Sequence, residues 1–283
     1  MAIANSLPRM RTLIKGVVDT LAPHLGRLYR QLRDERRQSQ PSRPTAFGIS
    51  LAGDASLKSG DFEKEELELF VELMTISAVC VDVGAHIGLY SCVAAKYGKH
   101  VVAVEPLQSN LSLLYRNLVT NGFLDVEVYP VGLASKAGLR QLFGGGTGAS
   151  LIEGWAGTAK EWRRMVPITL LDTIAGMRFM GSQLIIKMDV EGSELEVLKG
   201  AQRTLAINPK PYWLVEIMLS ENHPAGRNTS FQEIFEIFWG NGYEARTANL
   251  TRRLIARDDV TRWLRTGLVD FGSHNYLFVH SGD

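Results

Sequence analysis

The stretch from Val79 to Gly88, V-C-V-D-V-G-A-H-I-G, constrains the fold of this chain more than any other. It is an apolar, β-branched run that ends in an acid and two glycines, and residues 89–97 follow it with helical spacing. The order is therefore a buried strand, a tight loop and a helix. Such a junction places backbone N–H groups and the positive end of a helix dipole at the carboxyl edge of a sheet, where open α/β folds bind ligands.

Strands and helices continue to alternate along the rest of the chain. The pattern predicts strands at 100–104, 126–131, 165–170, 184–189 and 212–217, and helices at 62–74, 110–121, 194–205 and 231–241. It ends with a strand at 243–246, a basic helix around 259–265 and a strand at 276–280. Alternation without internal repeats predicts an α/β, Rossmann-like, doubly wound sheet. The ending favours an antiparallel final hairpin over another parallel unit.

Charge divides the chain into an arm and a body. Residues 1–46 carry nine Lys or Arg against three acids, whereas the remainder carries 22 basic and 27 acidic residues, a net charge of −5. The 283 residues, 45% of them hydrophobic, can bury a sizeable core. We therefore predict an N-terminal helical arm with its linker at 1–44 and one domain at 45–283. The acidic body argues against a broad nucleic-acid surface.

The arm has apolar residues at three- and four-residue steps between Met10 and Leu32, with arginines on much of the other face. This pattern predicts one or two amphipathic helices with a break at Pro23, and residues 38–44 read as a linker before a short strand within 45–57. Packing of the arm on its own domain or on a second copy of the chain is one interpretation. Peripheral contact with an anionic membrane is the other, and a nucleic-acid contact is disfavoured by the acidic body.

The cysteines and the hydropathy pattern indicate a cytoplasmic protein, with membrane association through the arm left open. Cys80 and Cys92 lie within the predicted strand and helix, fit no metal motif and read as buried free thiols of a reducing compartment. No stretch approaches about 20 consecutive apolar residues, so we expect no transmembrane helix. A compact apolar core before a small-residue cleavage site is absent from the N-terminus, so we expect no secretory signal.

The first two strands end in residues suited to a nucleoside. Asp82 closes the first strand, and Glu105 ends the second, 21 positions after Gly84. An acid at this place can accept hydrogen bonds from both ribose hydroxyls. The loop is G-x-x-x-G and lacks the third glycine of a dinucleotide site, which favours a phosphate-free cofactor such as S-adenosylmethionine over NAD. The alternative is that Gly84 and Gly88 only permit close packing of strand and helix.

Three blocks of sequence resemble the FkbM family of S-adenosylmethionine-dependent methyltransferases. They are D-V-G-A-H-I-G at 82–88, V-E-P at 104–106 and I-K-M-D-V-E-G-S-E-L-E-V-L-K-G-A at 186–201, and the third is the most specific. The resemblance covers roughly residues 47–280 and leaves out the arm. His86 departs from the Asn that the family often has there, which alters contacts to the methionine end of the cofactor.

The resemblance implies a seven-stranded class I methyltransferase sheet that binds S-adenosyl-L-methionine over its first two strands. It also implies O-methylation of a hydroxyl on a sugar, glycolipid or small natural product. The residues assigned to the cofactor are Asp82, Gly84, Ala85, His86, Gly88, Glu105, Pro106, Gly132 and Asp189.

The strand predicted over 184–189 carries the residues predicted for catalysis. Lys187 and Asp189 are two positions apart and share a face, and Asp189 and Glu191 lie at the carboxyl edge beside the cofactor. A protonated alcohol is a poor nucleophile, so a carboxylate general base contributes about 10²–10⁴ in rate. Asp189 is the first choice as base or substrate anchor, Glu191 the second, and Lys187 an ion-pair partner that orients Asp189. The alternative for Glu191 is stabilisation of a helix N-terminus.

Residues on later strands and loops complete the predicted acceptor side. Glu216 and Asp189 are the candidate ligands of a divalent metal, if one binds. Glu216, His223 and His274 are candidate substrate contacts, although a loop histidine is more often a solvated surface residue. Trp155 and Trp162 offer stacking surfaces for a sugar ring, with core packing as the alternative.

Two further functions stay open at this stage. One is a nucleic-acid methyltransferase acting on RNA, which the acidic body disfavours. The other is a cofactor-binding protein without catalysis. Because family members share the cofactor site and differ in acceptor, the fold does not specify the acceptor.

Overall fold

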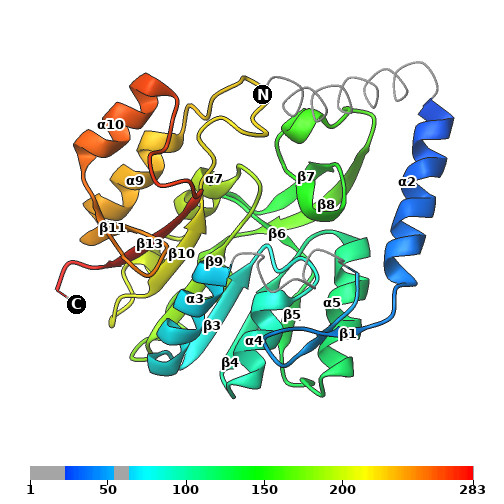
Figure 1. The fold of residues 1–283 in the computed structure, drawn as a ribbon, viewed down its shortest axis with the longest axis horizontal. Coiled ribbons are helices and arrows are strands. Elements are labelled where there is room, and N and C mark those ends of the chain that lie inside the picture. The colour runs from blue at the N-terminus through cyan, green and yellow to red at the C-terminus, as the bar shows by residue number, and fades with distance from the viewer. Residues whose placement is uncertain (1–22, 54–63, 283) are drawn as a thin grey trace.

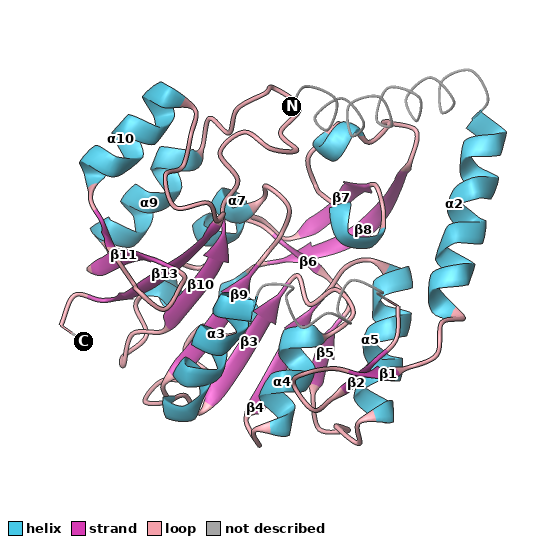
Figure 2. Ribbon diagram, in the orientation of Figure 1, coloured by secondary structure: helices cyan, strands magenta, loops and turns pink. Residues whose placement is uncertain are grey.

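The strand Val79–Val83 (β3) lies inside an eight-stranded mixed sheet, in the order β12-β11-β13-β10-β9-β3-β4-β5 (Figures 1 and 2). The computed structural model describes residues 23–53 and 64–282. The parallel strands are β3, His100–Val104 (β4), Glu127–Tyr129 (β5), Leu184–Met188 (β9) and Tyr212–Glu216 (β10). The expected α/β, Rossmann-like, doubly wound sheet is therefore confirmed.

The carboxyl-terminal strands form the expected antiparallel ending. Asn275–His280 (β13) lies between β10 and Tyr243–Thr247 (β11), antiparallel to both. The sheet has one strand more than the expected seven, because the two-residue strand Leu254–Ile255 (β12) pairs with the outer edge of β11. A two-residue strand carries too little alternation to be recognised in a sequence.

Helices cover both faces of the sheet and define two hydrophobic layers. Lys64–Ile76 (α3), Leu89–Lys96 (α4) and Gln108–Thr120 (α5) lie on one face, which is toward the viewer in Figure 1. The other face packs against Leu171–Ile174 (α6), Glu194–Lys199 (α7), Gln202–Leu205 (α8), Phe231–Gly240 (α9) and Arg257–Thr266 (α10). Both Cys80 and Cys92 are free and buried, as expected.

Strand alternation decides which polar residues reach the α3 side of the sheet. Val79, Val81 and Val83 pack in the α9 layer, whereas Cys80 packs in the α3–α5 layer. Asp82 has the parity of Cys80, and the same alternation places Lys187 of β9, Glu216 of β10 and Asn275 of β13 on this side. These four polar side chains thus share the α3 face of the sheet, near the carboxyl ends of its parallel strands.

A second, three-stranded sheet stands beside the main one, near the loop at residues 84–88 between β3 and α4, which we call the cofactor loop. Gly132–Leu133 (β6), Gly138–Phe143 (β7) and Arg163–Thr169 (β8) are arranged in the order β6-β8-β7. The strand expected over 126–131 ends early, at Tyr129, because Pro130 cannot donate a ladder hydrogen bond. The glycine-rich segment after β7, residues 144–150, contains the short 3₁₀ turn Gly146–Gly148 (η2), and a second such turn, Trp155–Gly157 (η3), follows it.

Two local expectations differ from the structure. The helix expected over 194–205 is divided into α7 and α8, because Gly200 ends α7 and packs so closely on the Ala134 carbonyl that a Cβ would overlap it. The linker expected over 38–44 contains the strand Arg43–Pro44 (β1), which pairs antiparallel with Ser50–Leu51 (β2).

The described part of the arm is one helix, Pro23–Gln38 (α2), which begins at the predicted break (Figure 1). Its carboxyl-terminal half contacts the domain: the Arg33 guanidinium lies over the Trp162 ring, and the Gln38 carbonyl accepts a 2.7 Å hydrogen bond from Arg116 of α5. The helix predicted before Pro23 lies outside the described residues. Within those described, no helix combines the length and apolar character needed to cross a membrane.

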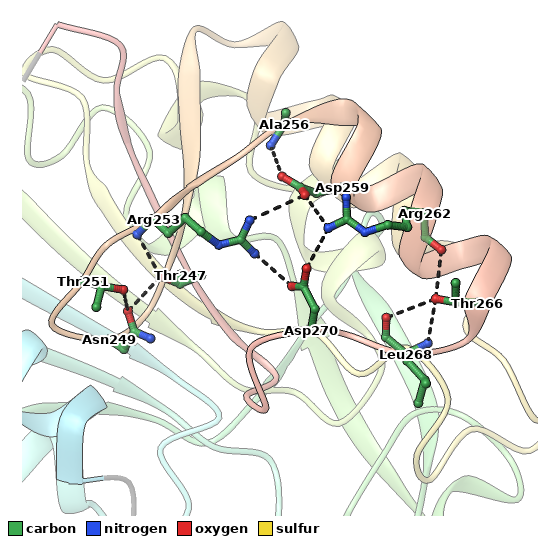
Figure 3. A network of polar contacts seen from close by, with 10 residues as sticks. All are labelled: Thr247, Asn249, Thr251, Arg253, Ala256, Asp259, Arg262, Thr266, Leu268 and Asp270. Carbon is green, nitrogen blue, oxygen red and sulfur yellow. Dashed lines mark hydrogen bonds and ion pairs between the residues drawn. The ribbon is translucent and has the colours of Figure 1, made fainter.

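The carboxyl-terminal helix α10 is fastened by an ionic network at the surface (Figure 3). Arg253 and Arg262 each contact both Asp259 and Asp270, at 2.6 to 3.5 Å. Asp259 also accepts the N–H of Ala256 at the start of the helix, at 3.0 Å. The network joins the segment after β11 to the loop before β13.

Candidate active site

A cavity of about 470 Å³ lies at the carboxyl ends of β3, β4, β9 and β10. Part of its wall comes from Leu142 of β7, from Gly146, Thr147 and Ala149 of the glycine-rich segment, and from Leu151. Among the predicted site residues, it is lined by Asp82, Gly84, Ala85, His86, Glu105, Pro106, Gly132, Lys187, Asp189, Glu191 and Glu216. Gly88, His223 and His274 are not among its lining residues. The volume falls within the range of about 300–1,000 Å³ that is usual for small-molecule sites.

The loop after β3 depends on glycine at two positions. Gly84 has a φ of +84°, and a Cβ there would overlap the carbonyl oxygen of Asp189. Gly88 has a φ of +88° and faces Leu114 of α5 just before α4 begins. The backbone N–H of Asp189 donates to the Val83 carbonyl at 3.0 Å. Gly84 therefore lets the cofactor loop and the end of β9 lie against each other.

We expect Gly84→Ala to destabilise the fold by about 2–3 kcal/mol, from a strained backbone and a steric overlap. Gly98→Ala is the matched control, because Gly98 has a φ of +68° but no atom lies within 4 Å of the place that its Cβ would take. It should cost only about 1 kcal/mol. Urea unfolding of both variants measures the difference, and equal losses would show that the Asp189 contact is unimportant.

Glu105 is a buried carboxylate held by backbone donors at the end of β4. Its Oε2 accepts the His86 N–H at 2.9 Å, and its Oε1 accepts the Leu107 N–H at 2.7 Å. Burial raises the pKa of Glu105 to about 7, against the lowering effect of these N–H groups and of Asn110. Each carboxylate oxygen can accept more than one hydrogen bond, so both retain capacity for the hydroxyls of a ribose.

Ligand binding that relies on ionised Glu105 should strengthen as pH rises through about 7, the pKa of this carboxyl. Below that pH the carboxyl is protonated, and its proton must leave before both oxygens can accept from hydroxyl groups. The affinity for S-adenosylhomocysteine should therefore increase about tenfold between pH 6 and pH 8 and then level off. Calorimetry at several pH values measures this slope. Glu105→Gln should bind more weakly and without the slope, and an unchanged slope in that variant would assign the titration to another group.

Asp82 binds the first turn of α4 from the end of β3. Its Oδ2 accepts the backbone N–H of Ser91 at 2.9 Å and the Ser91 hydroxyl at 2.5 Å. Burial raises its pKa to about 6, while the Ser91 hydrogen bonds and the charge of Lys187 oppose this rise. Asp82 therefore fixes the helix to the strand and also borders the cavity.

Lys187 forms a buried ion pair with a residue that sequence reasoning did not select. Its Nζ lies 2.9 Å from Oε1 of Glu66 in α3, 3.3 Å from Oδ1 of Asn275 and 5.1 Å from the centre of the Tyr90 ring. The Tyr90 hydroxyl donates to the same Glu66 oxygen at 2.7 Å. Glu66 of α3, rather than Asp189, is thus the ion-pair partner that the structure records. Lys187 is also one of the residues that line the cavity.

Asp189 and Glu191 form a pair of carboxylates just beyond β9, and both line the cavity. Trp155 donates its indole N–H to Glu191 at 2.5 Å, and Ser150 donates to the Glu191 carbonyl at 2.6 Å. Glu191 has a φ of +52°, so these contacts hold an unusual backbone conformation. Burial and the charge of Asp189 raise the pKa of Glu191 to about 8. The pair is suited to holding a single proton.

The helix that follows is stabilised by a different acid. Glu194 accepts the Gly192 N–H at 2.9 Å, and burial raises its pKa to about 7. Trp155, only 1% exposed, packs against Gly192. Trp155 thus holds Glu191 in place and offers no open face for stacking, whereas Trp162 is partly exposed and lies under Arg33.

Of the three candidate substrate contacts Glu216, His223 and His274, only Glu216 reaches the cavity. Glu216 lines the cavity from the end of β10. His223 instead packs edge-on to the Trp155 ring, with 6.0 Å between the ring centres, and burial lowers its pKa. His274 faces Glu221 at 3.9 Å. In the described part of the chain, no three His, Cys, Asp or Glu side chains are grouped so that they could hold a metal ion.

The cavity has the features that an S-adenosylmethionine site requires. Glu105 can accept from a ribose, and the narrow approach at Gly84 keeps the loop beside the carboxyl end of β9. The wall combines these polar groups with apolar side chains from several segments: Ile87, Leu89, Val131, Leu133, Leu142 and Leu151. A nucleoside needs such a mixture, because its base is largely apolar and its sugar is polar.

Solved structures of methyltransferases resemble this fold at low sequence identity. A SAM-dependent methyltransferase from Agrobacterium tumefaciens is 11% identical, covers 84% of this chain and 69% of its own, and has a TM-score of 0.43. A TehB-like enzyme from Corynebacterium glutamicum is 12% identical, with coverages of 77% and 88% and a TM-score of 0.41. A ribosomal protein L11 methylase from Lactobacillus delbrueckii is 13% identical, with coverages of 64% and 67% and a TM-score of 0.39.

A comparison with curated proteins finds no match. The family model of the methyltransferase FkbM domain matches residues 82–245, which run from the end of β3 into β11. This range contains the cofactor loop, Glu105 and the Asp189–Glu191 pair. The chain therefore belongs to the FkbM methyltransferase family, whose members use S-adenosylmethionine.

Proposed function

We propose that this methyltransferase methylates a hydroxyl group of a sugar, glycolipid or small natural product. The observation that carries the proposal is the pair Asp189 and Glu191, which lines the same cavity as Glu105. An O-methyltransferase needs a group that accepts the hydroxyl proton beside the site where the donor binds. Two half-buried carboxylates at the end of β9 supply such a group.

The bound donor supplies an activated methyl group, and the protein supplies positioning and proton transfer. In our proposal Glu105 binds the ribose, while the loop at Ala85 and His86 with Pro106 and Gly132 surrounds the rest of the donor. Asp189 takes the acceptor proton as the methyl group is transferred and the new O–CH₃ bond forms, while Glu191, whose pKa is raised to about 8, is largely protonated at neutral pH and orients the acceptor by hydrogen bonding. Alignment of the hydroxyl with the methyl group contributes several kcal/mol more.

The charge distribution supports a small or carbohydrate acceptor rather than a nucleic acid. Residues 47–283 carry 22 basic and 27 acidic side chains, and RNA binding ordinarily needs a basic surface that neutralises phosphates. Glu216 adds another acid to the cavity wall. Sugar hydroxyls can donate to such carboxylates, whereas a phosphate backbone would be repelled by them.

Untargeted mass spectrometry of glycans, lipids and small metabolites tests the proposal. Cells with and without the gene should differ by at least one compound pair separated by about 14 mass units, the mass of one CH₂ group gained on O-methylation. The purified enzyme should then methylate the unmodified compound. A methylated RNA or protein as the gene-dependent product would overturn the proposed acceptor class while leaving methyl transfer intact.

A further inference from the structure

Arg37 of the arm helix α2 joins three segments at the rim of the cavity. Its Nε donates to the Gly53 carbonyl at 2.9 Å, and its Nη1 donates to Oδ1 of Asn110 at 2.8 Å. Its Nη2 contacts Nε2 of His86. These partners lie after β2, at the start of α5 and in the loop after β3. A single guanidinium therefore ties the arm to the cofactor loop and to α5.

Two of these partners also hold Glu105. The His86 backbone N–H donates to Oε2 of Glu105 at 2.9 Å, and the Asn110 side chain lies close enough to the same carboxylate to lower its pKa. Asn110 is only 2% exposed, so its orientation is fixed by its partners. Arg37 is thus connected to Glu105 through His86 and, separately, through Asn110.

Asn110 also connects Arg37 to the glycine-rich segment. Asn110 Nδ2 donates to the Gly146 carbonyl at 3.2 Å, and Gly146 itself lines the cavity. A Cβ on Gly146 would lie 3.6 Å from Nη1 of Arg37. The guanidinium therefore lies between two walls of the cavity, the loop after β3 and the segment after β7.

We propose that Arg37 is a positioning residue of the donor site, and that docking of α2 and binding of the donor strengthen each other. The proposal rests on the proposed function only in taking the adenosyl donor as the ligand of this cavity. Arg37 orients His86 and Asn110, which in turn present Glu105 to the ribose. Because such coupling is reciprocal, a bound donor must stabilise the docked arm by the same free energy.

Donor affinity of full-length variants is the first test, with S-adenosylhomocysteine as the probe in calorimetry. Arg37→Ala should weaken binding about tenfold, as expected when charge-assisted hydrogen bonds to a site are lost. Arg37→Lys should also bind poorly, because an ammonium group cannot reproduce the planar fork that spans three partners. Arg36→Ala is the matched control: Arg36 is the exposed neighbour, and its loss should change the affinity less than about twofold.

Hydrogen exchange of the unmodified chain gives a second test that needs no variant. S-Adenosylhomocysteine should slow amide exchange in the carboxyl-terminal turns of α2, although residues 32–38 of this helix are not among those that line the cavity. In Arg37→Ala this slowing should disappear, while thermal unfolding of the domain without ligand stays within about 2 °C of wild type.

The outcomes separate the inference from the proposed function. Failure of the wild-type chain to bind S-adenosylhomocysteine would contradict both. Tight wild-type binding with equal affinities for Arg37→Ala and Arg36→Ala would contradict this inference alone. Exchange in α2 that the ligand does not change would contradict it as well.

Discussion

Asp189→Asn should lower kcat by about 10²–10⁴-fold, a loss far larger than its effect on donor affinity. Asparagine has the shape of aspartate but cannot accept the proton of the acceptor hydroxyl. The backbone of residue 189, whose N–H binds the Val83 carbonyl, keeps its contacts in this variant. Steady-state kinetics with the identified acceptor, together with calorimetry of S-adenosylhomocysteine, measures the two quantities separately.

Two further variants sharpen the result for Asp189. Asp125→Asn alters an exposed acid in the loop before β5 and should leave kcat unchanged. Glu191→Gln should lower kcat less than Asp189→Asn, because in our proposal Glu191 orients the acceptor and Asp189 takes its proton. A loss in Glu191→Gln that exceeds the loss in Asp189→Asn would reverse the two roles, and a kcat within about threefold of wild type in both would exclude carboxylate base catalysis.

The second large effect concerns stability and the buried ion pair beneath the cavity. Lys187→Met should destabilise the protein by about 3–5 kcal/mol, because it leaves the Glu66 carboxylate buried without its cation. The side chains of Lys187 and Glu66 are only 3% and 4% exposed, and Oε2 of Glu66 is a buried atom that has no hydrogen-bond partner among the described residues. Urea unfolding monitored by circular dichroism measures the loss.

A double variant and an exposed pair distinguish loss of charge balance from loss of packing. Glu66→Gln combined with Lys187→Met should recover at least half of the lost stability, since no unpaired charge remains and Gln can still accept from Tyr90. Lys199→Met removes the cation of an exposed pair with Glu233, whose side chains are 42% and 53% exposed, and should cost less than about 1 kcal/mol. Equal losses for Lys187→Met and Lys199→Met would show that burial of the pair is unimportant.

The parts of the fold predicted correctly are those whose signals are local. The β3–loop–α4 junction is continuous in sequence, and its strand and helix lie within a residue of the expected bounds. Glu105 is assigned from its place at the end of the second strand, and it does line the cavity. Parallel strands bring their carboxyl ends to one edge, so residues at strand ends can be grouped without knowing the rest of the structure.

The contacts that sequence reasoning misses join segments far apart in the chain. Glu66 and Lys187 are separated by more than one hundred residues, and their pairing depends on which helix covers β3 and β9. One signal is present, because Glu66 shares a helix face with Phe70 and Leu73, where an acid among buried apolar residues needs a partner. The contacts of Arg37 lack any such signal, since the amphipathic pattern of the arm assigns its arginines to solvent.

Two other differences between expectation and structure concern the helix expected over 194–205 and the role of Trp155. The Lys199–Gly200 dipeptide is a helix stop, yet apolar spacing on both sides favours one helix over 194–205. Trp155 is a candidate for stacking because a flexible glycine-rich segment precedes it. Its packing on Gly192 and its hydrogen bond to Glu191 depend on how that segment folds over the end of β9.

Titration of the full-length chain with S-adenosylhomocysteine tests the central claim most directly, namely that this cavity binds the methyl donor. We expect one molecule to bind per chain with a dissociation constant in the micromolar range, and Glu105→Ala to weaken binding at least about tenfold. The thermal unfolding temperature should rise with ligand concentration in the wild type and much less in the variant. No heat and no thermal shift at millimolar ligand, or equal binding by wild type and Glu105→Ala, would contradict the claim.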